Sequence, residues 1–557
     1  MSAQIIELDG RLILTYTGSD GAFYRLGSAY HADYYQRIWA ESHLSDYRHA
    51  VYLVFGLGDG SYLQELIRVA DSDSLFIVYE PDSDIYETAA KAFALDSLAE
   101  RDNVIIIHNA AVSEFKDIIN RRVSSVAFIG MRICVYPNYN RIFASEYDSF
   151  CEAVESVRYS KSSSQRTIAN NGRIAIYNIL NNFKVLAHSQ SITALKDIVS
   201  PDIPVIICGA GPSLNDAIPH LPTVKGRALI LCVDSALPAL LKHDIIPDLM
   251  ISVDPIKEDF NFKDPRVKNI PGVFPMPCRN FIFDGRTAPS FFYNCAGSIA
   301  ALFADTYGIE LPDLKATSSV GNHAYAVAEY LGSRTIILTG IDMAYKNNRT
   351  HADGTLLENQ DSSTLPCQTM VKGVDGSMLA SDLSMNMYRT QLEERIVQNT
   401  AVTINTSSCG AAFSGTIQMP FEEALDKYCP VPAQADFSLY APLNLDLSVF
   451  FGEFRNILEN FTNDTEFILT RLNDLKSARS ISESEADILI PACDEMLQKI
   501  LCFPVQLSVL YASLCEFNAQ YNTIFKKDTP DAVVSGYISI FEALLKGVDY
   551  LKELETF

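Results

Sequence analysis

The sequence predicts an α/β protein: a Rossmann-like amino-terminal domain at 1–155, a Rossmann-like central domain at 156–430 and an α-helical carboxy-terminal domain at 431–557. Three observations support this order. Short, continuous apolar runs alternate with helical patterns up to residue 430, which is typical of parallel sheets covered on both faces. Two of these runs enter glycine-rich turns. Beyond residue 430 the apolar residues recur at helical spacing instead.

Composition argues against several kinds of partner. The chain of 557 residues has a formal net charge of −24, which argues against a nucleic-acid surface or an anionic membrane as its main partner. None of its 12 cysteines forms a C-x-x-C motif and several lie in apolar runs, so we expect reduced thiols and a cytoplasmic location. The first residues lack the pattern of a signal peptide, and no apolar run reaches the roughly 18 residues of a membrane span.

The amino-terminal domain contains the pattern of strand, glycine-rich turn, helix and strand. Glycines in such a turn let a nucleotide approach the backbone, and an acid at the end of the second strand can accept from ribose hydroxyls. Three interpretations stay open: a scaffold without ligand, which we favour, a ligand-binding site, and a methyltransferase. The residues concerned are strand 51–55, the turn with Gly56, Gly58 and Gly60, helix 61–70 and strand 75–80 with Glu80 at its end, and further strands are expected at 104–108 and 126–130.

In the central domain, an apolar run at 205–208 is followed by the turn Gly209-Ala210-Gly211-Pro212-Ser213-Leu214, which opens a helix. Glycines allow close approach of a ligand, and free N–H groups at a helix start favour an anion. We therefore expect a nucleotide or sugar-nucleotide phosphate at this turn, with a tight turn without ligand as the alternative. Before it, residues 156–200 form a polar helix in which Asn171 and Asn178 either cover the nucleotide pocket or face solvent.

Three later apolar strands end in acids, namely Asp234, Asp254 and Asp342. In parallel sheets ligands bind beyond the carboxyl ends of the strands, so we expect these acids and Gly211 to line one crevice. Carboxylates also suit Mg²⁺ bound to a nucleotide phosphate. Mg²⁺ is therefore the one cofactor considered, although no motif requires it.

Four motifs occur in order, G-A-G-P-S-L, S-V-D-P, A-T-S-S-V-G and L-T-G-I-D-M-A-Y, and R-T-H-A follows them. Over residues 160–420 this set resembles the motility-associated factor proteins, bacterial glycosyltransferases that modify flagellin, and its core resembles the sialyltransferases of glycosyltransferase family 42. The resemblance implies a sialyltransferase-type central domain and an inverting protein O-glycosyltransferase. Such an enzyme would move a nonulosonic acid of the pseudaminic or legionaminic type from its CMP ester to Ser or Thr of flagellin, for flagellum assembly and motility.

The resemblance also implies a set of nucleotide-binding residues. The glycine turn would lie against the nucleotide, and a later serine- and threonine-rich segment would donate to a phosphate or carboxylate. The lysine before that segment stands where family 42 has an arginine. One strand-end asparagine of that family is Asp234 here, and an ionised aspartate accepts hydrogen bonds but donates none. The set is Gly209, Gly211, Pro212, Ser213, Leu214, Asp234, Lys315, Thr317, Ser318, Gly340 and Asp342.

Four residues are candidates for the chemistry. His351 matches the T-H of the motility-associated motif, and a loop histidine that titrates near neutrality is a competent base, although a structural role in its loop is the alternative. Family 42 uses a histidine in a later loop, where this chain has none, and Asp375 is the second candidate base there. Tyr345 lies one residue from the position of a tyrosine that contacts the leaving phosphate in that family. Asp254 completes the group.

Two other functions stay open. The core also resembles the 6-hydroxymethyl-dihydropterin pyrophosphokinases, which are usually short single-domain chains, so the flanking domains argue against that activity. A non-catalytic accessory protein that binds flagellin is the other function, and the missing loop histidine favours it. In the helical part, the aromatic faces at 447–461 and 534–551 form either a core or a groove for helices of flagellin.

Overall fold

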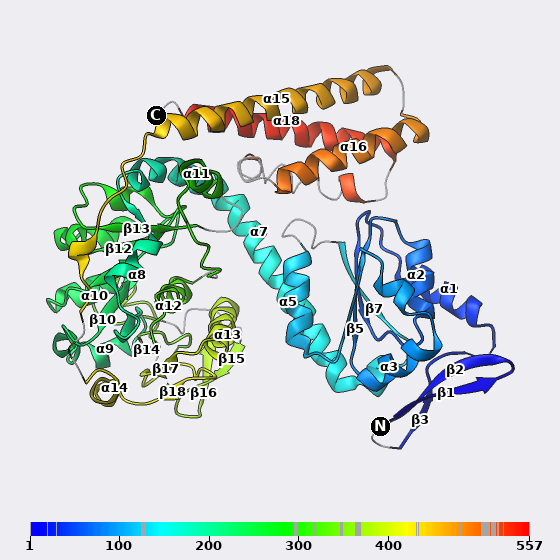
Figure 1. Ribbon diagram of the computed structural model, residues 1–557, viewed down its shortest axis with the longest axis horizontal. Coiled ribbons are helices and arrows are strands. Elements are labelled where there is room, and N and C mark those ends of the chain that lie inside the picture. The colour runs from blue at the N-terminus through cyan, green and yellow to red at the C-terminus, as the bar shows by residue number, and fades with distance from the viewer. Residues whose placement is uncertain are drawn as a thin grey trace. The chain divides into compact units, whose positions relative to one another are not determined.

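The computed structural model describes residues 2–555, except 19–20, 29, 124–129, 295–298, 317–318, 346–348, 362–368, 431, 433, 479–480, 503–508, 510–512, 514–519, 521–522 and 527–528. It has a mixed α/β structure with parallel sheets, as the sequence predicts (Figure 1). The chain forms two compact units. Unit 1 contains Met1–Asn170, Glu466–Glu495 and Ser513–Leu544, and unit 2 contains Asn171–Thr465, Met496–Ala512 and Leu545–Phe557.

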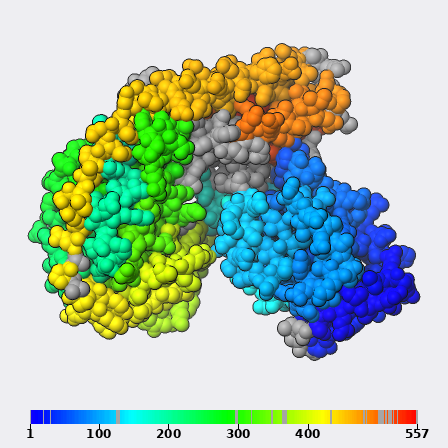
Figure 2. All heavy atoms as spheres, in the orientation of Figure 1, coloured from blue at the N-terminus to red at the C-terminus, as the bar shows by residue number. Residues whose placement is uncertain are grey.

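Unit 1 begins with an antiparallel sheet in the order β1-β2-β3, formed by Ser2–Leu8, Arg11–Thr17 and Phe23–Arg25 (Figure 1). The atoms of this segment are dark blue in Figure 2. Asp9 and Gly10 connect β1 to β2, and both have positive φ angles, 52° and 75°. Such a two-residue turn matches the twist of the paired strands, which explains the Asp-Gly sequence. The Ala3 backbone N–H donates to Asp84 at 2.6 Å and so fixes β1 to α3 of the same unit.

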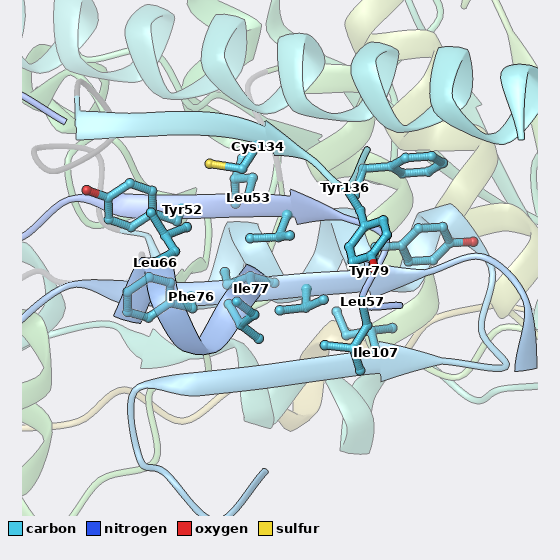
Figure 3. Close-up of a cluster of buried hydrophobic side chains, with 14 of the residues drawn as sticks. Tyr52, Leu53, Leu57, Leu66, Phe76, Ile77, Tyr79, Ile107, Cys134 and Tyr136 are labelled. Carbon is cyan, nitrogen blue, oxygen red and sulfur yellow. The ribbon is translucent and has the colours of Figure 1, made fainter. Parts of the chain in front are cut away.

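A parallel sheet in the order β6-β5-β4-β7 forms the centre of unit 1, and its apolar side chains pack into one buried cluster (Figure 3). The strands predicted at 51–55, 75–80 and 104–108 are confirmed, while the one predicted at 126–130 lies almost wholly outside the described residues. The strands are β4 (Val51–Phe55), β5 (Leu75–Glu80), β6 (Val104–His108) and β7 (Met131–Val135), and the helices are α1 (Ala32–His43), α2 (Ser61–Val69), α3 (Ser83–Ala92), α4 (Asp96–Ala99), α5 (Val112–Arg122), α6 (Tyr139–Ile142) and α7 (Ala144–Leu186), which continues into unit 2.

Aromatic side chains of the chain itself fill the glycine-rich turn of unit 1. A Cβ atom on Gly56 would lie 2.2 Å from the Tyr139 ring, and one on Gly58 would lie 2.3 Å from the Tyr136 ring. Glu80 is 1% exposed and accepts hydrogen bonds from a backbone N–H of the turn at 2.8 Å and from the Tyr139 hydroxyl at 3.0 Å. The acid expected to contact a ribose therefore holds the turn and Tyr139 instead, which favours the scaffold interpretation.

Glu80 should make unit 1 less stable as pH rises. Burial raises the pKa of Glu80 from its ordinary 4.5 to about 7. In this window the folded chain keeps the proton that the unfolded chain releases, so the stabilisation is complete below pH 4.5 and is lost as pH rises through 7. The loss amounts to about 3 kcal/mol, at about 1.4 kcal/mol per pKa unit.

The measurement compares the wild type with Glu80→Gln by urea unfolding at several pH values. Fluorescence of Trp39, the single tryptophan of the chain, reports on unit 1, where its indole N–H donates to the Val135 carbonyl at 2.9 Å. The advantage of the wild type over the variant should shrink as pH rises through this window. A difference in unfolding free energy that stays constant with pH would contradict the role given to Glu80.

Parts of two carboxy-terminal helices belong to unit 1, α16 (Glu483–Cys502) as far as Glu495 and α18 (Pro530–Glu555) as far as Leu544. Arg48 donates to the Asp494 carboxylate at 2.8 Å, to the Tyr537 hydroxyl at 2.9 Å and to the Ile524 carbonyl at 2.5 Å. The His49 Nε2 atom lies 3.2 Å from the same carboxylate. The helices expected beyond residue 430 are thus present, with their residues shared between the two units, and the domain boundaries at 155 and 430 stay predictions.

Unit 2 is built on a parallel sheet whose described strands follow the order β18-β17-β14-β9-β10-β11-β12-β13-β8. From β9 the chain adds strands on one side as far as β13, and it then returns to place β14 on the other side of β9. The strand order therefore reverses between β9 and β14, and such a switch point leaves a crevice at the carboxyl ends of the strands. The strands are β8 (Gln190–Ser191), β9 (Val205–Cys208), β10 (Leu229–Val233), β11 (Leu249–Ile251), β12 (Gly272–Pro275), β13 (Ser290–Tyr293), β14 (Thr335–Thr339), β17 (Val402–Asn405) and β18 (Ile417–Gln418), and β15 (Thr369–Lys372) pairs with β16 (Met378–Ser381) as a hairpin.

Helices of unit 2 share an aromatic core. Phe183 stacks on Phe303 with ring centroids 4.3 Å apart, and Phe450 lies edge-on to Phe183 at 4.7 Å. The aromatic face at 447–461 is therefore core in this unit. None of the described helices combines the length and apolar character needed to cross a membrane. The helices are α8 (Leu195–Ile198), α9 (Leu214–Ala217), α10 (Leu237–Lys242), α11 (Ala300–Tyr307), α12 (Val320–Tyr330), α13 (Leu383–Gln398), α14 (Phe421–Tyr428) and α15 (Leu447–Ala478), whose residues from Glu466 on belong to unit 1.

Candidate functional site

A cavity of about 210 Å³ lies at the carboxyl edge of the unit 2 sheet, at the switch point between β9 and β14. The turns after β9, β10 and β14 form part of its wall. The loop with Thr350 and His351, the start of α12 and residues of α13 form the rest. Five of the predicted site residues meet here although they are distant in sequence, namely Gly209, Gly211, Gly340, Asp342 and His351.

Close packing of two turns explains the glycines of the motif. A Cβ atom on Gly209 would lie 2.3 Å from the Gly340 carbonyl oxygen, and one on Gly211 would lie 2.5 Å from Asp342 Oδ2. The Gly209 N–H donates to the Thr339 carbonyl and the Gly211 N–H to the Gly340 carbonyl, both at 2.8 Å. The turn after β9 is thus bonded directly to the turn after β14, with no room for a side chain between them.

Asp342 takes the anion position at the start of α9. Its carboxylate accepts from the Ser213 backbone N–H at 2.9 Å, and from the hydroxyls of Ser213 and Ser407 at 2.5 Å each. The side chain is 4% exposed, and burial raises the pKa of Asp342. The expectation that free N–H groups at this helix start face a phosphate is therefore wrong at Ser213, because a carboxylate of the chain already occupies the place.

The remaining residues of the G-x-G-P-S-L motif support the turn. Ser213 and Leu214 are buried, 1% and 0% exposed, and neither they nor Pro212 line the cavity. The following backbone N–H groups, those of Leu214 to Asp216, donate to carbonyls of the same turn at 3.0–3.2 Å. The motif therefore contributes its two glycines to the cavity wall, and its last three residues hold those glycines in place.

His351 lines the cavity. Its Nδ1 atom lies 2.9 Å from the Thr350 hydroxyl, and that hydroxyl lies 3.3 Å from Gln360 Oε1. When the hydroxyl donates to Gln360 it accepts from Nδ1–H, and the tautomer with this bond has its lone pair on Nε2. Burial and the nearby Lys257 ammonium lower the pKa of His351. A neutral imidazole with its lone pair on Nε2 can take a proton from a hydroxyl.

Asp234 is paired inside the protein. It is 1% exposed, with Lys257 Nζ at 2.9 Å from Oδ1 and the Ser252 hydroxyl donating to Oδ2 at 2.5 Å. Its oxygen atoms therefore bond to the chain's own groups, and it does not line the cavity as expected. The pair places the Lys257 ammonium where its charge acts on His351.

Asp254 also lies outside the cavity lining. Its carboxylate accepts from the Ile256 backbone N–H at 2.9 Å and so closes the turn after β11. The Asn178 amide donates to the carbonyls of Pro255 at 2.9 Å and Pro277 at 3.1 Å, so this residue of α7 holds two strand-end turns together. Neither side chain takes the part in a ligand pocket that was expected from its position in the sequence.

Three further predicted residues lie elsewhere. The Tyr345 hydroxyl donates to Asp382 Oδ2 at 2.8 Å, at the start of α13. Lys315 is exposed and takes a positive φ of 47°, outside the cavity lining. Asp375 belongs to the β15–β16 turn, where it accepts from the Ser377 N–H at 2.9 Å, and it lines a different cavity of about 550 Å³. A base at Asp375 would therefore serve a different cavity from the one that His351 lines.

Thr317 and Ser318 lie outside the described residues. The next residue, Ser319, lines the cavity and caps α12, because its hydroxyl oxygen accepts from the Gly321 N–H at 3.3 Å. Sequence reasoning missed Ser319 and two other lining residues, Ser235 and Tyr388. The strand-end rule could have found Ser235, which follows β10 closely, whereas no motif marks Tyr388 on α13.

A metal requirement stays a prediction. In the part of the chain that the structure describes, no group of three or more His, Cys, Asp or Glu side chains gathers into a metal site. The carboxylates considered for Mg²⁺, those of Asp234 and Asp254, bond to Lys257, to the Ser252 hydroxyl and to a backbone N–H.

Comparison with solved structures extends over the whole chain. The structure of MAf glycosyltransferase from Magnetospirillum magneticum AMB-1 superimposes with a TM-score of 0.63 over 100% of this chain and 93% of that chain. The sequence identity is 15%, so this likeness is one of fold.

Sequence comparisons match shorter segments. The family described as 6-hydroxymethylpterin diphosphokinase MptE-like matches residues 177–348, less than half of the chain. Two curated relatives, both uncharacterized proteins from Treponema pallidum (strain Nichols), are 32% identical over 108 residues and 27% identical over 201 residues, which are 18% and 34% of this chain. The chain covers 27% and 34% of their lengths. The chain is therefore similar in fold to a glycosyltransferase along its whole length, and similar to the MptE-like family around its candidate site.

Proposed function

We propose that the chain is a protein O-glycosyltransferase that moves a nonulosonic acid from its CMP ester to Ser or Thr hydroxyls of flagellin. One observation carries the proposal: the imidazole of His351 meets two glycine turns in a cavity at the switch point of the sheet, in a chain with the fold of a MAf glycosyltransferase. The fold likeness supports glycosyl transfer. The CMP ester, the acidic sugar and flagellin rest on the motif resemblance.

The nucleotide part of the donor is assigned to the cavity. Its volume of about 210 Å³ is smaller than the roughly 300–1,000 Å³ of pockets that enclose whole ligands, so the sugar extends beyond it. Because Asp342 fills the start of α9, the phosphate is assigned to the start of α12. Ser319, Val320 and Gly321 line the cavity there, and N–H groups at a helix start favour an anion. Thr317 and Ser318 precede this helix directly.

The proposed transfer is a direct displacement. The acceptor hydroxyl oxygen bonds to the anomeric carbon, the bond from that carbon to the phosphate oxygen breaks, CMP leaves as an anion, and His351 Nε2 takes the hydroxyl proton. Attack from the face opposite the leaving group inverts the anomeric centre. Tyr388 lines the cavity, whereas the Tyr345 hydroxyl donates to Asp382.

Replacing Lys257 with methionine should move the acid limb of the rate profile to higher pH. The Lys257 ammonium contributes to the lowered pKa of His351, so its removal raises that pKa. Protonated, inactive His351 then persists to higher pH, and transfer begins to fail at a higher pH than in the wild type. The measurement is kcat for transfer against pH.

Lys263→Met is the matched control, because this exposed lysine pairs with Asp259 at 3.7 Å and does not act on His351. Its profile should coincide with that of the wild type. If the acid limb does not shift in a folded Lys257→Met chain, Lys257 does not control the pKa of the catalytic base.

The function itself is tested with the full chain, a CMP-activated pseudaminic or legionaminic acid, and flagellin purified from a strain unable to make the sugar. Intact-mass spectrometry should show flagellin gaining whole sugar units as CMP is released. Unchanged flagellin mass with either donor, from a chain that binds CMP, would overturn the proposal and favour the accessory protein.

A diphosphokinase is the second candidate, and the MptE-like match over residues 177–348 favours it. It would transfer a diphosphate group from ATP to the hydroxymethyl group of a pterin and release AMP. Incubation with ATP, Mg²⁺ and 6-hydroxymethyl-dihydropterin distinguishes the two enzymes, because the glycosyltransferase should release no AMP. AMP release that depends on the pterin would replace the first proposal.

A further inference from the structure

A second cavity, of about 500 Å³, lies at the opposite edge of the unit 2 sheet. Its wall contains residues 188–189 and 287–290, directly before β8 and at the start of β13, so it adjoins the amino-terminal ends of these parallel strands. The end of α7 and the segment around Tyr440 and Pro442 complete the wall. Because every strand of this sheet is parallel, the candidate active site and this cavity open at different edges.

The wall of this cavity is basic, although the chain carries a formal net charge of −24. Lys184, His188 and Arg286 line it, and among its described lining residues there is no acidic side chain. Lys184 and His188 are exposed. A basic surface in so acidic a chain concentrates anions locally against the overall field.

Arg286 has no carboxylate partner within the described ranges of the chain. Its guanidinium donates to the Ser290 hydroxyl at 3.0 Å, to the Val267 carbonyl at 3.3 Å and to the Ile270 carbonyl. Burial lowers the pKa of Arg286 to about 10. Carbonyl and hydroxyl oxygens satisfy its N–H groups but supply no counter-charge, so the buried positive charge carries a free-energy cost that a bound anion would reduce.

Apolar groups lie beside these cations and are fixed in place. Phe283, Pro289 and Tyr440 line the cavity, and the Tyr440 ring packs edge-on against Phe291 at 5.4 Å between centroids. The Leu443 N–H donates to the Ser189 carbonyl at 2.7 Å and so holds the segment after Tyr440 against the end of α7. The ligand that this wall fits has a charged end and a ring or apolar part.

We propose that this cavity is a second ligand site, which binds a small organic anion with a phosphate or carboxylate group and a ring. The anionic group contacts Lys184 and is attracted by the positive charge of Arg286, and the ring packs against Phe283 and Tyr440. The volume of about 500 Å³ falls within the roughly 300–1,000 Å³ of small-molecule pockets. This site is independent of the proposed transfer reaction, because none of its lining residues lines the cavity of His351.

The test uses the full chain and three probes: CMP, benzoate and inorganic phosphate. Hydrogen exchange measured by mass spectrometry locates each probe, because protection at 184–189, 283–290 and 440–442 marks this cavity and protection at 209–211 marks the candidate active site. CMP or benzoate should protect the first set, whether or not the second responds. Protection by inorganic phosphate as strong as by the ring-bearing probes would overturn the ring requirement, and no protection of the first set by any probe would overturn the site.

Lys184→Glu is the decisive variant, because its exposed side chain has no structural partner to lose among the described residues. Reversal of its charge should weaken the binding of the ring-bearing probe about tenfold at this cavity. Lys196→Glu is the matched control, an exposed lysine of the same unit whose ammonium lies 4.1 Å from the centre of the Tyr330 ring. Equal affinity in Lys184→Glu and the wild type, or equal weakening in both variants, would overturn the proposal.

Discussion

Replacing His351 with glutamine should lower kcat for sugar transfer by about 10²–10⁴-fold, the usual contribution of a general base, while CMP still binds. Glutamine can keep a hydrogen bond to Thr350 but cannot take a proton from the acceptor hydroxyl. The variant removes the Nε2 lone pair, which is present in the tautomer that donates from Nδ1 to Thr350. Single-turnover transfer to flagellin and calorimetry with CMP measure the two effects separately.

Thr350→Val is the matched control for this variant. It preserves the shape of the side chain but removes the hydroxyl that lies between His351 Nδ1 and Gln360 Oε1. Transfer should fall less than in His351→Gln, because the imidazole remains and adopts the productive tautomer part of the time. Turnover at the wild-type rate in a folded His351→Gln chain would remove His351 from the reaction.

The Asp342→Ala variant should lose about 3–5 kcal/mol of unfolding free energy in unit 2, because it leaves several buried hydrogen-bond donors without an acceptor. The Ser213 N–H, the Ser213 hydroxyl and the Ser407 hydroxyl all donate to this carboxylate. Without it, the side-chain bonding between the turns after β9 and β14 is reduced to the Gly340 N–H, which donates to the Ser213 hydroxyl at 3.1 Å. Hydrogen exchange of the β9 and β14 amides, measured against urea concentration, follows the loss.

Asp216→Ala provides the comparison. Asp216 lies in the same turn region and accepts from the Ser408 hydroxyl, but it is exposed. Its loss should change the unfolding free energy by no more than about 0.5 kcal/mol, as for most surface substitutions. Equal exchange rates in Asp342→Ala and Asp216→Ala would show that the carboxylate does not stabilise the two turns.

Part of each parallel sheet could be predicted, because the apolar runs of some strands are continuous. The predicted strands are β4, β5 and β6 of unit 1 and β9, β10, β11 and β14 of unit 2, whereas β7, β8, β12, β13, β17 and β18 were not predicted. The same patterns placed Gly209, Gly211 and Asp342 at one cavity, since all three follow strands that meet at the switch point. These patterns did not predict why the two positions require glycine. Gly211 is needed because Asp342 lies against it, and that contact joins residues 131 positions apart, which no local pattern contains.

Strand-end position alone did not predict side-chain direction. Asp234 and Asp254 each follow a strand as Asp342 does, yet one turns to Lys257 and the other closes its own turn. Which way a strand-end side chain points depends on the loop after it, and loops are determined by tertiary contacts. The same reason hid Tyr388, whose helix reaches the cavity only in the folded chain.

In unit 1 the sequence pattern typical of a nucleotide-binding turn is present, but side chains of the chain itself fill the turn. The strand, glycine turn and acid are all present as predicted, but Tyr136 and Tyr139 lie against Gly58 and Gly56. These tyrosines come from the end of the sheet domain, about 80 residues after the turn. The spacing of residues within the motif could not predict that side chains from a distant segment would fill the glycine-rich turn.

The pairing of Arg48 with the end of the chain affects how the protein is made. Its partners Asp494 and Tyr537 follow 446 and 489 positions later, so the ribosome must finish almost the entire polypeptide before they exist. Protein synthesis adds about 5–20 residues per second, so Arg48 lacks these partners for at least about 20 s after the first sheet domain is made. Chaperones can bind the domain in this period. A premature stop before residue 494 therefore weakens the part of the protein that is synthesised first, although none of that part is missing.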